Sequence, residues 1–286
     1  MRTRHLYFTF VVYVLIFILQ MQNVTHAQSS SILNGLSWLN STQSADGSWD
    51  STTASTDSVQ ATSVALESLA VLNSTGSPNY VNAANWLIVQ QLDTTRHLSD
   101  RLKILVTSSA DKNLILSYVD ELSKAWGGYD GFTINALDTT LALQALKAAN
   151  YSDTTVLYQA INFLTTNQHS DGGWGFTSND PSNAYVTAMV LRSLSGYSSQ
   201  FSVQSPISNA AAFLLAKQTQ NNDGGFGSSP STVYETALSV MALIESGQGT
   251  AQALQNGINY LTSAQLPNGS WNNDPYYTAL ALQALA

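Results

Sequence analysis

A short pattern recurs along this chain, and its spacing constrains the fold more than any single residue does. Each complete copy places an aromatic-Leu pair five residues before a Gln, which is followed by Asp-Gly or Asn-Gly and then by another aromatic residue. The complete copies begin at Trp38, Phe163, Phe213 and Tyr260. Two partial copies lie at 86–91 and 126–129. Repeats at periods of roughly 50 residues predict an array of similar structural units.

The Gln and the last aromatic residue of each copy are expected to be structural. A Gln amide can bond backbone groups left open at a turn, and the Asp-Gly or Asn-Gly pair permits a positive φ. The aromatic side chain can bury a large area against the neighbouring unit. These motif residues are Gln43 with Trp49, Gln168 with Trp174, Gln218 with Phe226, and Gln265 with Trp271.

A second segment follows each copy and aligns on a Thr, at Thr62, Thr139, Thr187, Thr236 and Thr278. The positions four and seven residues after the Thr are apolar in every copy, which is helical spacing. These Ala-rich segments predict inner helices buried on most sides, whereas the first segments are amphipathic and face solvent. Inner helices are expected near 57–72, 97–109, 137–149, 183–196, 232–246 and 275–286, and outer helices near 32–43, 81–91, 111–124, 153–168, 207–218 and 250–265.

About six such helical hairpins, each an outer helix, a Gly-rich turn and an inner helix, predict an all-α fold. We expect a double ring, an α6/α6 toroid, formed by a single domain over residues 28–286. The ring should enclose a lumen whose one mouth collects the starts of all the inner helices.

The first residues have the pattern of a secretory signal. Arg2 and Arg4 precede an apolar run, and Thr25-His26-Ala27 precedes an expected cleavage after residue 27. We therefore expect a bacterial protein exported to the surface or exterior, touching the membrane only through this segment. An uncleaved membrane anchor is the competing interpretation. The apolar pattern runs to Ala286 without a capping residue, which is consistent with further domains downstream.

Composition excludes several classes of protein. The formal net charge is −8 and only 10% of residues are charged, so no basic surface for nucleic acid is expected. The chain has no Cys, so an exported form would depend on its core rather than on disulfides. The 44% hydrophobic content is enough for one domain of this length.

The segment Gln-x-x-Asp-Gly-Ser-Trp at 43–49, with its relatives at 168–174, 218–226 and 265–271, resembles the QW repeat of squalene-hopene cyclases and of protein prenyltransferase β subunits. The resemblance covers about residues 32–286 and implies a terpenoid cyclase/prenyltransferase-like α/α toroid. Cobalamin carriers and thioester domains of complement share this ring, so the fold alone does not select a function.

The resemblance also implies where catalysis would lie. Similar cyclases use an Asp-x-Asp-Asp-Thr-Ala element at the start of an inner helix, and its protonated middle Asp donates a proton to an alkene. The matching segment here starts at Asn135 and places Leu137 at the proton-donor position, so that Asp138 and Thr139 are what remains of the element. We therefore expect no cyclase of this mechanism.

A prenyltransferase of this fold would need zinc held by Asp, Cys and His. With no Cys, and with only His97 and His169 after the leader, the sequence predicts neither a metal site nor a cofactor.

Residues just before each aligned Thr form the candidate site, because the starts of the inner helices should gather at one mouth. They are Gln60, Asp138, Tyr185, Tyr234, Glu235, Tyr276 and Tyr277. Tyr combines an apolar face with a polar tip and suits ligand binding. The alternative is that these residues cap helices and pack against loops, and Asp57 and Asp138 are typical of helix N-termini.

The function favoured by these patterns is an exported toroid that binds a small or hydrophobic ligand, or a partner, at its inner mouth without chemistry. The alternative is an enzyme, either cyclase-like or acting on polysaccharides, in which Asp138 and Glu235 form an acid–base pair. A structural repeat domain at a cell surface is the third hypothesis.

Overall fold

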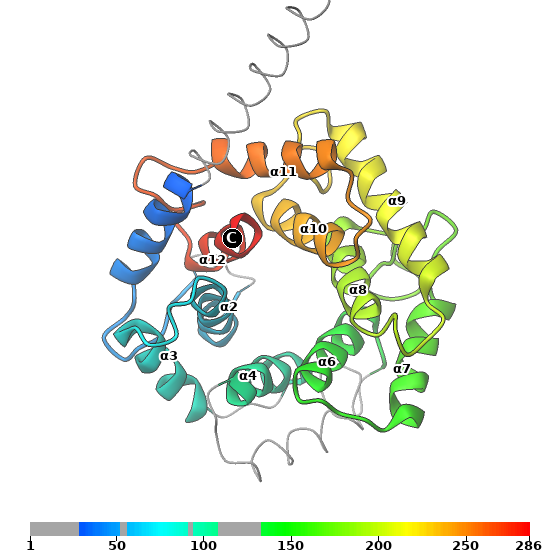
Figure 1. Cartoon of the computed structure of the whole chain (residues 1–286), viewed down its shortest axis with the longest axis horizontal. Coiled ribbons are helices and arrows are strands. Elements are labelled where there is room, and N and C mark those ends of the chain that lie inside the picture. Colours follow the sequence, from blue (N-terminus) through cyan, green and yellow to red (C-terminus); the bar gives the residue numbers. More distant parts are fainter. Residues whose placement is uncertain (1–28, 52–55, 91–93, 108–132) are drawn as a thin grey trace, which may run out of the picture.

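The chain forms a closed ring of helices in two concentric layers (Figure 1). The structure, a computed structural model, describes residues 29–51, 56–90, 94–107 and 133–286. The inner layer contains α2 (Ser58–Val71), α4 (Thr95–Thr107), α6 (Ala136–Ala148), α8 (Ala184–Gly196), α10 (Val233–Glu245) and α12 (Pro275–Leu285). The outer layer contains a helix at 29–41, α3 (Pro78–Ile88), α7 (Thr154–Thr166), α9 (Gln204–Asn221) and α11 (Ala251–Ser263). The predicted α/α toroid is confirmed.

The helices lie close to where the periodicity predicted them. The inner helix expected at 97–109 is observed at Thr95–Thr107, and the outer helix expected at 81–91 is observed at Pro78–Ile88. The predicted outer helix 111–124, the partial repeat at 126–129 and the predicted leader 1–27 lie outside the described residues. No helix in the described ranges has both the length and the apolar character needed to cross a bilayer.

Inner helices begin at side-chain caps. Asp57, Asn135, Asn183, Thr232 and Asp274 each occupy the N-cap and accept a hydrogen bond from a backbone N–H of the first turn. The capping role expected of Asp57 is confirmed. Asp138, by contrast, lies in the first turn behind the cap Asn135, so its expected position as the cap itself is wrong.

Each motif Gln joins its own turn to the start of the next outer helix, because its Nε2 donates to two backbone carbonyls at once. The paired acceptors, at 2.8–3.0 Å, are Gly47 and Asn79 for Gln43, Gly172 and Pro206 for Gln168, Gly224 and Ala253 for Gln218, and Gly269 and Ser31 for Gln265. The predicted bond to the turn is therefore present. The second bond links neighbouring repeats.

The aromatic residue that ends each motif is fully buried, and in the three motifs that end in Trp it is anchored at two points. The indole N–H groups of Trp49, Trp174 and Trp271 donate to carbonyls of the preceding outer helix at 2.7–2.8 Å. The backbone N–H of the same aromatic donates to the aligned Thr of the following inner helix. These pairs are Trp49 with Thr62, Trp174 with Thr187, Phe226 with Thr236, and Trp271 with Thr278, at 2.9–3.0 Å. The repeated Thr is thus the contact that fixes the turn on the inner helix.

The turn Gly is required by a close approach as well as by its backbone angle. Gly269 has φ +93°, and a Cβ there would lie 2.5 Å from the carbonyl oxygen of Asn34 on the first outer helix. Gly47 has φ +98°, and a Cβ there would likewise collide with the carbonyl oxygen of Asn82. A side chain at either position would push adjacent repeats apart.

The last repeat closes onto the first. In Figure 1, α12 lies beside α2, and the Gln283 Nε2 donates to the carbonyl of Val64 at 3.0 Å. Gln265 makes the corresponding outer contact with Ser31 at 2.9 Å. Closure therefore uses the same bonds that join consecutive repeats.

Replacing Gln265 with Leu should lower the free energy of unfolding by about 1–3 kcal/mol, because two carbonyls lose their donor where the ring closes. Urea denaturation followed by circular dichroism measures the change. Gln252→Leu is the matched control, since Gln252 is exposed on α11 and should change stability by less than about 0.5 kcal/mol. Equal losses in both variants would show that the closing contact contributes nothing specific.

Candidate functional site

The starts of the inner helices bring four tyrosines into one continuous cluster, here called the tyrosine mouth: Tyr185, Tyr234, Tyr276 and Tyr277. The ring centroids of Tyr185 and Tyr234 are 5.9 Å apart, those of Tyr234 and Tyr277 are 5.8 Å apart, and those of Tyr277 and Tyr276 are 6.0 Å apart. All three pairs meet edge to face, the arrangement that aromatic rings prefer. Phe176 extends the cluster, because its ring centroid lies 6.1 Å from that of Tyr185.

Three phenols of the tyrosine mouth, those of Tyr234, Tyr276 and Tyr277, stay neutral over the physiological range. Burial raises the pKa of Tyr234 to about 12, and burial also raises the pKa values of Tyr276 and Tyr277 above their usual value. The cluster therefore offers apolar ring surface and uncharged hydroxyl groups.

A cation that is not among the predicted site residues lies in this mouth. Arg96 on α4 donates from its Nη2 to the Tyr185 hydroxyl at 2.8 Å. This is the one hydrogen bond of the guanidinium within the described residues, although Arg offers five donors. Arg96 therefore has donors available for a polar end group of a ligand.

Gln60 joins the same cluster through a hydrogen bond between its side chain and that of Tyr276. Both residues are buried, at 8% exposure. Five of the predicted site residues thus lie together: Gln60, Tyr185, Tyr234, Tyr276 and Tyr277. Whether they bind a ligand stays a prediction.

Glu235 is a buried carboxylic acid beside this cluster, at 4% exposure in the first turn of α10. Its Oε2 accepts a hydrogen bond from the N-cap hydroxyl of Thr232 at 2.7 Å. Burial raises the pKa of the carboxyl group, although the bonds from Thr232 and from the backbone of Ser228 oppose the rise. A carboxyl group in such surroundings is more readily kept protonated than an exposed one.

Asp138 has a different environment. It is half-buried in the first turn of α6 and accepts a hydrogen bond from the Nδ2 of its own cap residue, Asn135, at 2.5 Å. Figure 1 shows α8 between α6 and α10. Among the described residues no contact joins the carboxylates of Asp138 and Glu235, so the predicted acid–base pair finds no support in the geometry.

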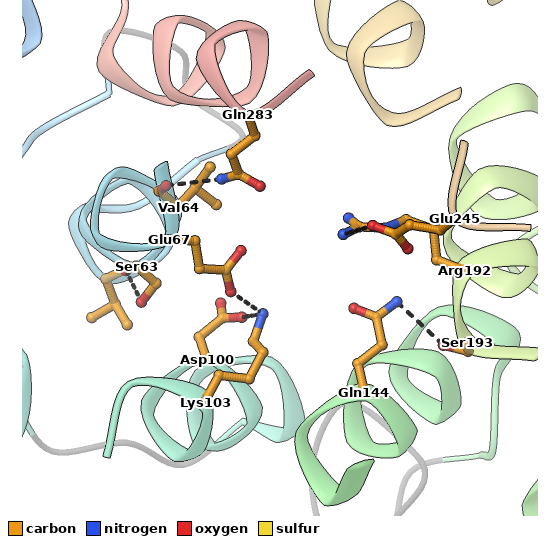
Figure 2. Close-up of polar contacts among 11 residues, drawn as sticks. Ser63, Val64, Glu67, Asp100, Lys103, Gln144, Arg192, Ser193, Glu245 and Gln283 are labelled. Carbon is orange, nitrogen blue, oxygen red and sulfur yellow. Dashed lines mark hydrogen bonds and ion pairs between the residues drawn. The ribbon is translucent and has the colours of Figure 1, made fainter. Parts of the chain in front are cut away.

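The opposite mouth, at the ends of the inner helices, is lined by charged and amide side chains (Figure 2). Four of these, Glu67, Gln144, Arg192 and Gln283, lie five residues after the aligned Thr of their helices. That register is the signal that could have identified them. The inner helices were predicted from the apolar positions four and seven residues after the Thr, and this polar register is not among them.

Two hollows on the outside of the ring are consequences of the repeat. One, of about 640 Å³, lies between the turn of Gly224 and α11, and another, of about 370 Å³, lies between the turn of Gly47 and α3. Since they occupy equivalent places in two repeats, they reflect the packing of each turn on the next outer helix. The described residues contain no group of three or more His, Asp or Glu side chains that could hold a metal ion.

Two family models match the chain. The model described as squalene-hopene cyclase C-terminal domain matches residues 139–282, and the model described as prenyltransferase alpha-alpha toroid domain matches residues 3–101.

Curated relatives match over short regions. Lanosterol synthase erg7A of Aspergillus fumigatus is 29% identical over 126 residues, which are 40% of this chain and 16% of that protein. Squalene–hopene cyclase of Alicyclobacillus acidocaldarius is 42% identical over 52 residues, which are 18% of this chain and 8% of that protein. The chain thus spans less than a fifth of the length of either relative.

Solved structures share the whole ring. The type II terpene cyclase MstE from Scytonema superposes with a TM-score of 0.73 at 17% identity, covering 91% of this chain and 98% of that one. A GH76 α-mannanase, BT2949 of Bacteroides thetaiotaomicron, superposes with a TM-score of 0.66 at 10% identity, covering 90% of this chain and 94% of that one. At these identities the similarity establishes the fold and nothing finer.

One ion pair at the starts of the inner helices is sensitive to pH. The His97 Nε2 lies 2.7 Å from the Asp57 Oδ2, and this bond raises the pKa of His97 and lowers that of Asp57. A raised His pKa stabilises the fold fully below the unfolded value of 6.5 and ceases to do so as the pH rises through the folded value.

His97→Asn should therefore destabilise the protein more at about pH 5.5 than at about pH 9. Urea denaturation at the two pH values measures the difference. In an Asp57→Asn background the same substitution should lose most of its pH dependence, because the partner charge is gone. A pH dependence that is unchanged in that background would assign the effect to another group.

Proposed function

This chain belongs to the squalene-hopene cyclase C-terminal domain family, and from that premise we propose that it is a terpene-cyclase-like enzyme acting on an isoprenoid ligand held at the tyrosine mouth. The sequence motifs favoured a module without chemistry, whereas family membership favours the enzyme alternative. The observation that carries the proposal is the buried carboxyl group of Glu235 beside a continuous cluster of tyrosines.

The tyrosine mouth suits an isoprenoid ligand in two ways. Its ring faces and edges offer apolar contact to a hydrocarbon chain, and the same π-systems attract a positive charge that develops on the ligand. Arg96 and the hydroxyl groups supply hydrogen bonds for a polar end group. The mouth therefore combines an apolar surface with a small number of polar groups, as ligand sites usually do.

Glu235 is the candidate acid. In the proposed step the O–H bond of the carboxyl group breaks and its proton is transferred to one carbon of an alkene. The π electron pair of the alkene forms the new C–H bond, and the other alkene carbon becomes a carbocation. Glu235 becomes a carboxylate, and loss of a proton from the cyclised cation restores the acid. Its raised pKa favours the protonated form that this step needs.

The second candidate is a binding module that performs no chemistry. Two observations favour it. Leu137 stands at the proton-donor position of the family's motif, and Glu235 already accepts a hydrogen bond from the cap of its own helix. A ligand could then occupy the tyrosine mouth unchanged.

Glu235→Gln should reduce turnover of an isoprenoid substrate by at least about 100-fold, the usual contribution of a general acid. The assay incubates the protein with squalene, geranylgeraniol and a prenylated benzoate, and detects products by mass spectrometry. Asp180→Asn, in the turn with Thr177, is the control carboxylate and should retain the parent rate. Thermal melting of each variant shows that it is folded.

Full turnover by the Gln variant would exclude Glu235 as the acid. If the parent protein forms no product but binds the substrates, the binding module replaces the enzyme.

Tyr185→Ala combined with Tyr234→Ala should weaken binding of the same isoprenoids by at least about tenfold, because two ring contacts are lost. Fluorescence titration measures the dissociation constants. Tyr158→Ala is the matched control, since Tyr158 lies on the outer helix α7 with 58% of its surface exposed. Equal affinities in the two variants would place the ligand away from the tyrosine mouth.

A further inference from the structure

The far end of the lumen contains a second hollow whose chemistry differs from that of the tyrosine mouth. It has a volume of about 430 Å³ and lies at the ends of the inner helices. We call it the polar mouth and define it by Glu67, Lys103, Gln144, Arg192, Glu245 and Gln283, which Figure 2 shows facing one another across the opening. Each of the six inner helices α2, α4, α6, α8, α10 and α12 contributes one of these side chains.

The charges of the polar mouth are paired within the protein. Lys103 lies between Glu67 and Asp100, with its Nζ 3.1 Å from the Asp100 Oδ1. Burial alone would lower the pKa of Lys103, but these two carboxylates hold it above the usual value. On the other side Arg192 forms a bidentate pair with Glu245, with bonds of 2.7–3.1 Å. Lys103 faces two carboxylates, but Lys147 also lines the hollow, so that three cations stand against three carboxylates and the formal charges balance.

Two amide side chains are oriented by their donor groups. The Gln283 Nε2 donates to the carbonyl of Val64 at 3.0 Å, and the Gln144 Nε2 donates to the Ser193 Oγ at 3.2 Å. Within the described part of the chain neither amide oxygen receives a hydrogen bond, and Figure 2 shows both amide groups extending toward the opening. The protein thus holds two acceptors in place without satisfying them.

Donors are available in the same hollow. Arg192 uses its Nε and Nη2 atoms on Glu245, and among the described residues no group accepts a hydrogen bond from its Nη1. Lys147, which also lines the hollow, lies over the ring of Tyr197 with its Nζ 5.1 Å from the centroid. Fixed acceptors and fixed donors therefore surround one opening.

We propose that the polar mouth binds a neutral, polyhydroxylated ligand of mono- or disaccharide size. A hydroxyl group both donates and accepts, so a set of vicinal hydroxyls can satisfy the amide oxygens and the remaining N–H groups together. Because the formal charges of the hollow balance, neither an anion nor a cation finds a net counter-charge there. The volume falls within the usual range of small-molecule sites, about 300–1,000 Å³.

The polar mouth is separate from the tyrosine mouth. On the inner helices the residues two positions after the aligned Thr lie on the same face, between the tyrosines and the polar end. Leu141, Met189, Leu238 and Leu280 occupy this layer and are 2–6% exposed. The inference is therefore independent of the proposed cyclase-like function and can fail or succeed without it.

The test is isothermal titration of the full chain with neutral sugars at millimolar concentration, using maltose, cellobiose and mannobiose. Glucosamine and glucuronic acid are included as charged counterparts. A neutral sugar should bind, and Gln144→Leu combined with Gln283→Leu should weaken its binding by at least about tenfold, because two acceptors are removed. Gln252→Leu, an exposed Gln on α11, is the matched control and should bind like the parent.

Three results would overturn the proposal: no binding of any neutral sugar, binding of the charged sugars alone, or equal affinity in the double variant and the parent. The double variant also loses the bond to Val64, so its thermal melting is measured in parallel. If it is unfolded, Gln144→Leu alone replaces it, because that side chain does not take part in closing the ring.

Discussion

The ring depends on one repeated interaction, the double hydrogen bond of the motif Gln. Its amide joins the carbonyl of its own turn to a carbonyl at the start of the next outer helix. Each repeat thereby sets the position of its successor through backbone atoms, which do not change with the rest of the sequence. At Gln265 the successor is the outer helix at 29–41, so the contact that propagates the array also closes it. A solenoid with the same bonds and less curvature would leave these groups unpaired at both ends.

Closure places all the inner helices parallel, and this makes the two mouths electrostatically different. Helix N-termini carry partial positive charge and C-termini partial negative charge. Asp138 and Glu235 lie in first turns, where an acid is favoured, while Lys103, Lys147 and Arg192 lie toward the opposite ends, where a cation is favoured. Glu67 and Glu245 oppose this rule at the opposite mouth, where Lys103 and Arg192 pair with them. Arg96 opposes it at the helix starts, where the one hydrogen bond of its guanidinium to the described residues goes to the Tyr185 hydroxyl rather than to a carboxylate, so its position needs another reason. A ligand end group would supply one.

Much of the fold could be predicted because the repeat is local. Aligning Thr187, Thr236 and Thr278 identified inner helices, and the tyrosines before these residues were expected to meet since parallel helices start at one mouth. The geometry does not support the proposed pairing of Asp138 with Glu235. Side chains at adjacent helix positions point about 100° apart around the helix axis, so the side chain that follows an inward tyrosine points toward a loop. The ion pair between Arg192 and Glu245 could not be predicted, because the two residues are 53 positions apart in the sequence and only the curvature of the ring brings them together.

The same 100° rotation determines how a proton could leave Glu235. Tyr234 occupies the inward position of α10 that corresponds to Leu137 of α6, and Glu235 follows it toward the loop at 227–232. That loop has room for the carboxyl group because residue 227 is Gly, with φ +120°, and a Cβ there would collide with the Glu235 side chain. Glu235 lies close enough to Tyr234 and Tyr277 to influence both phenols. On the proposed function, an alkene must therefore approach from the side of the tyrosine cluster that borders this loop, rather than along the axis of the ring.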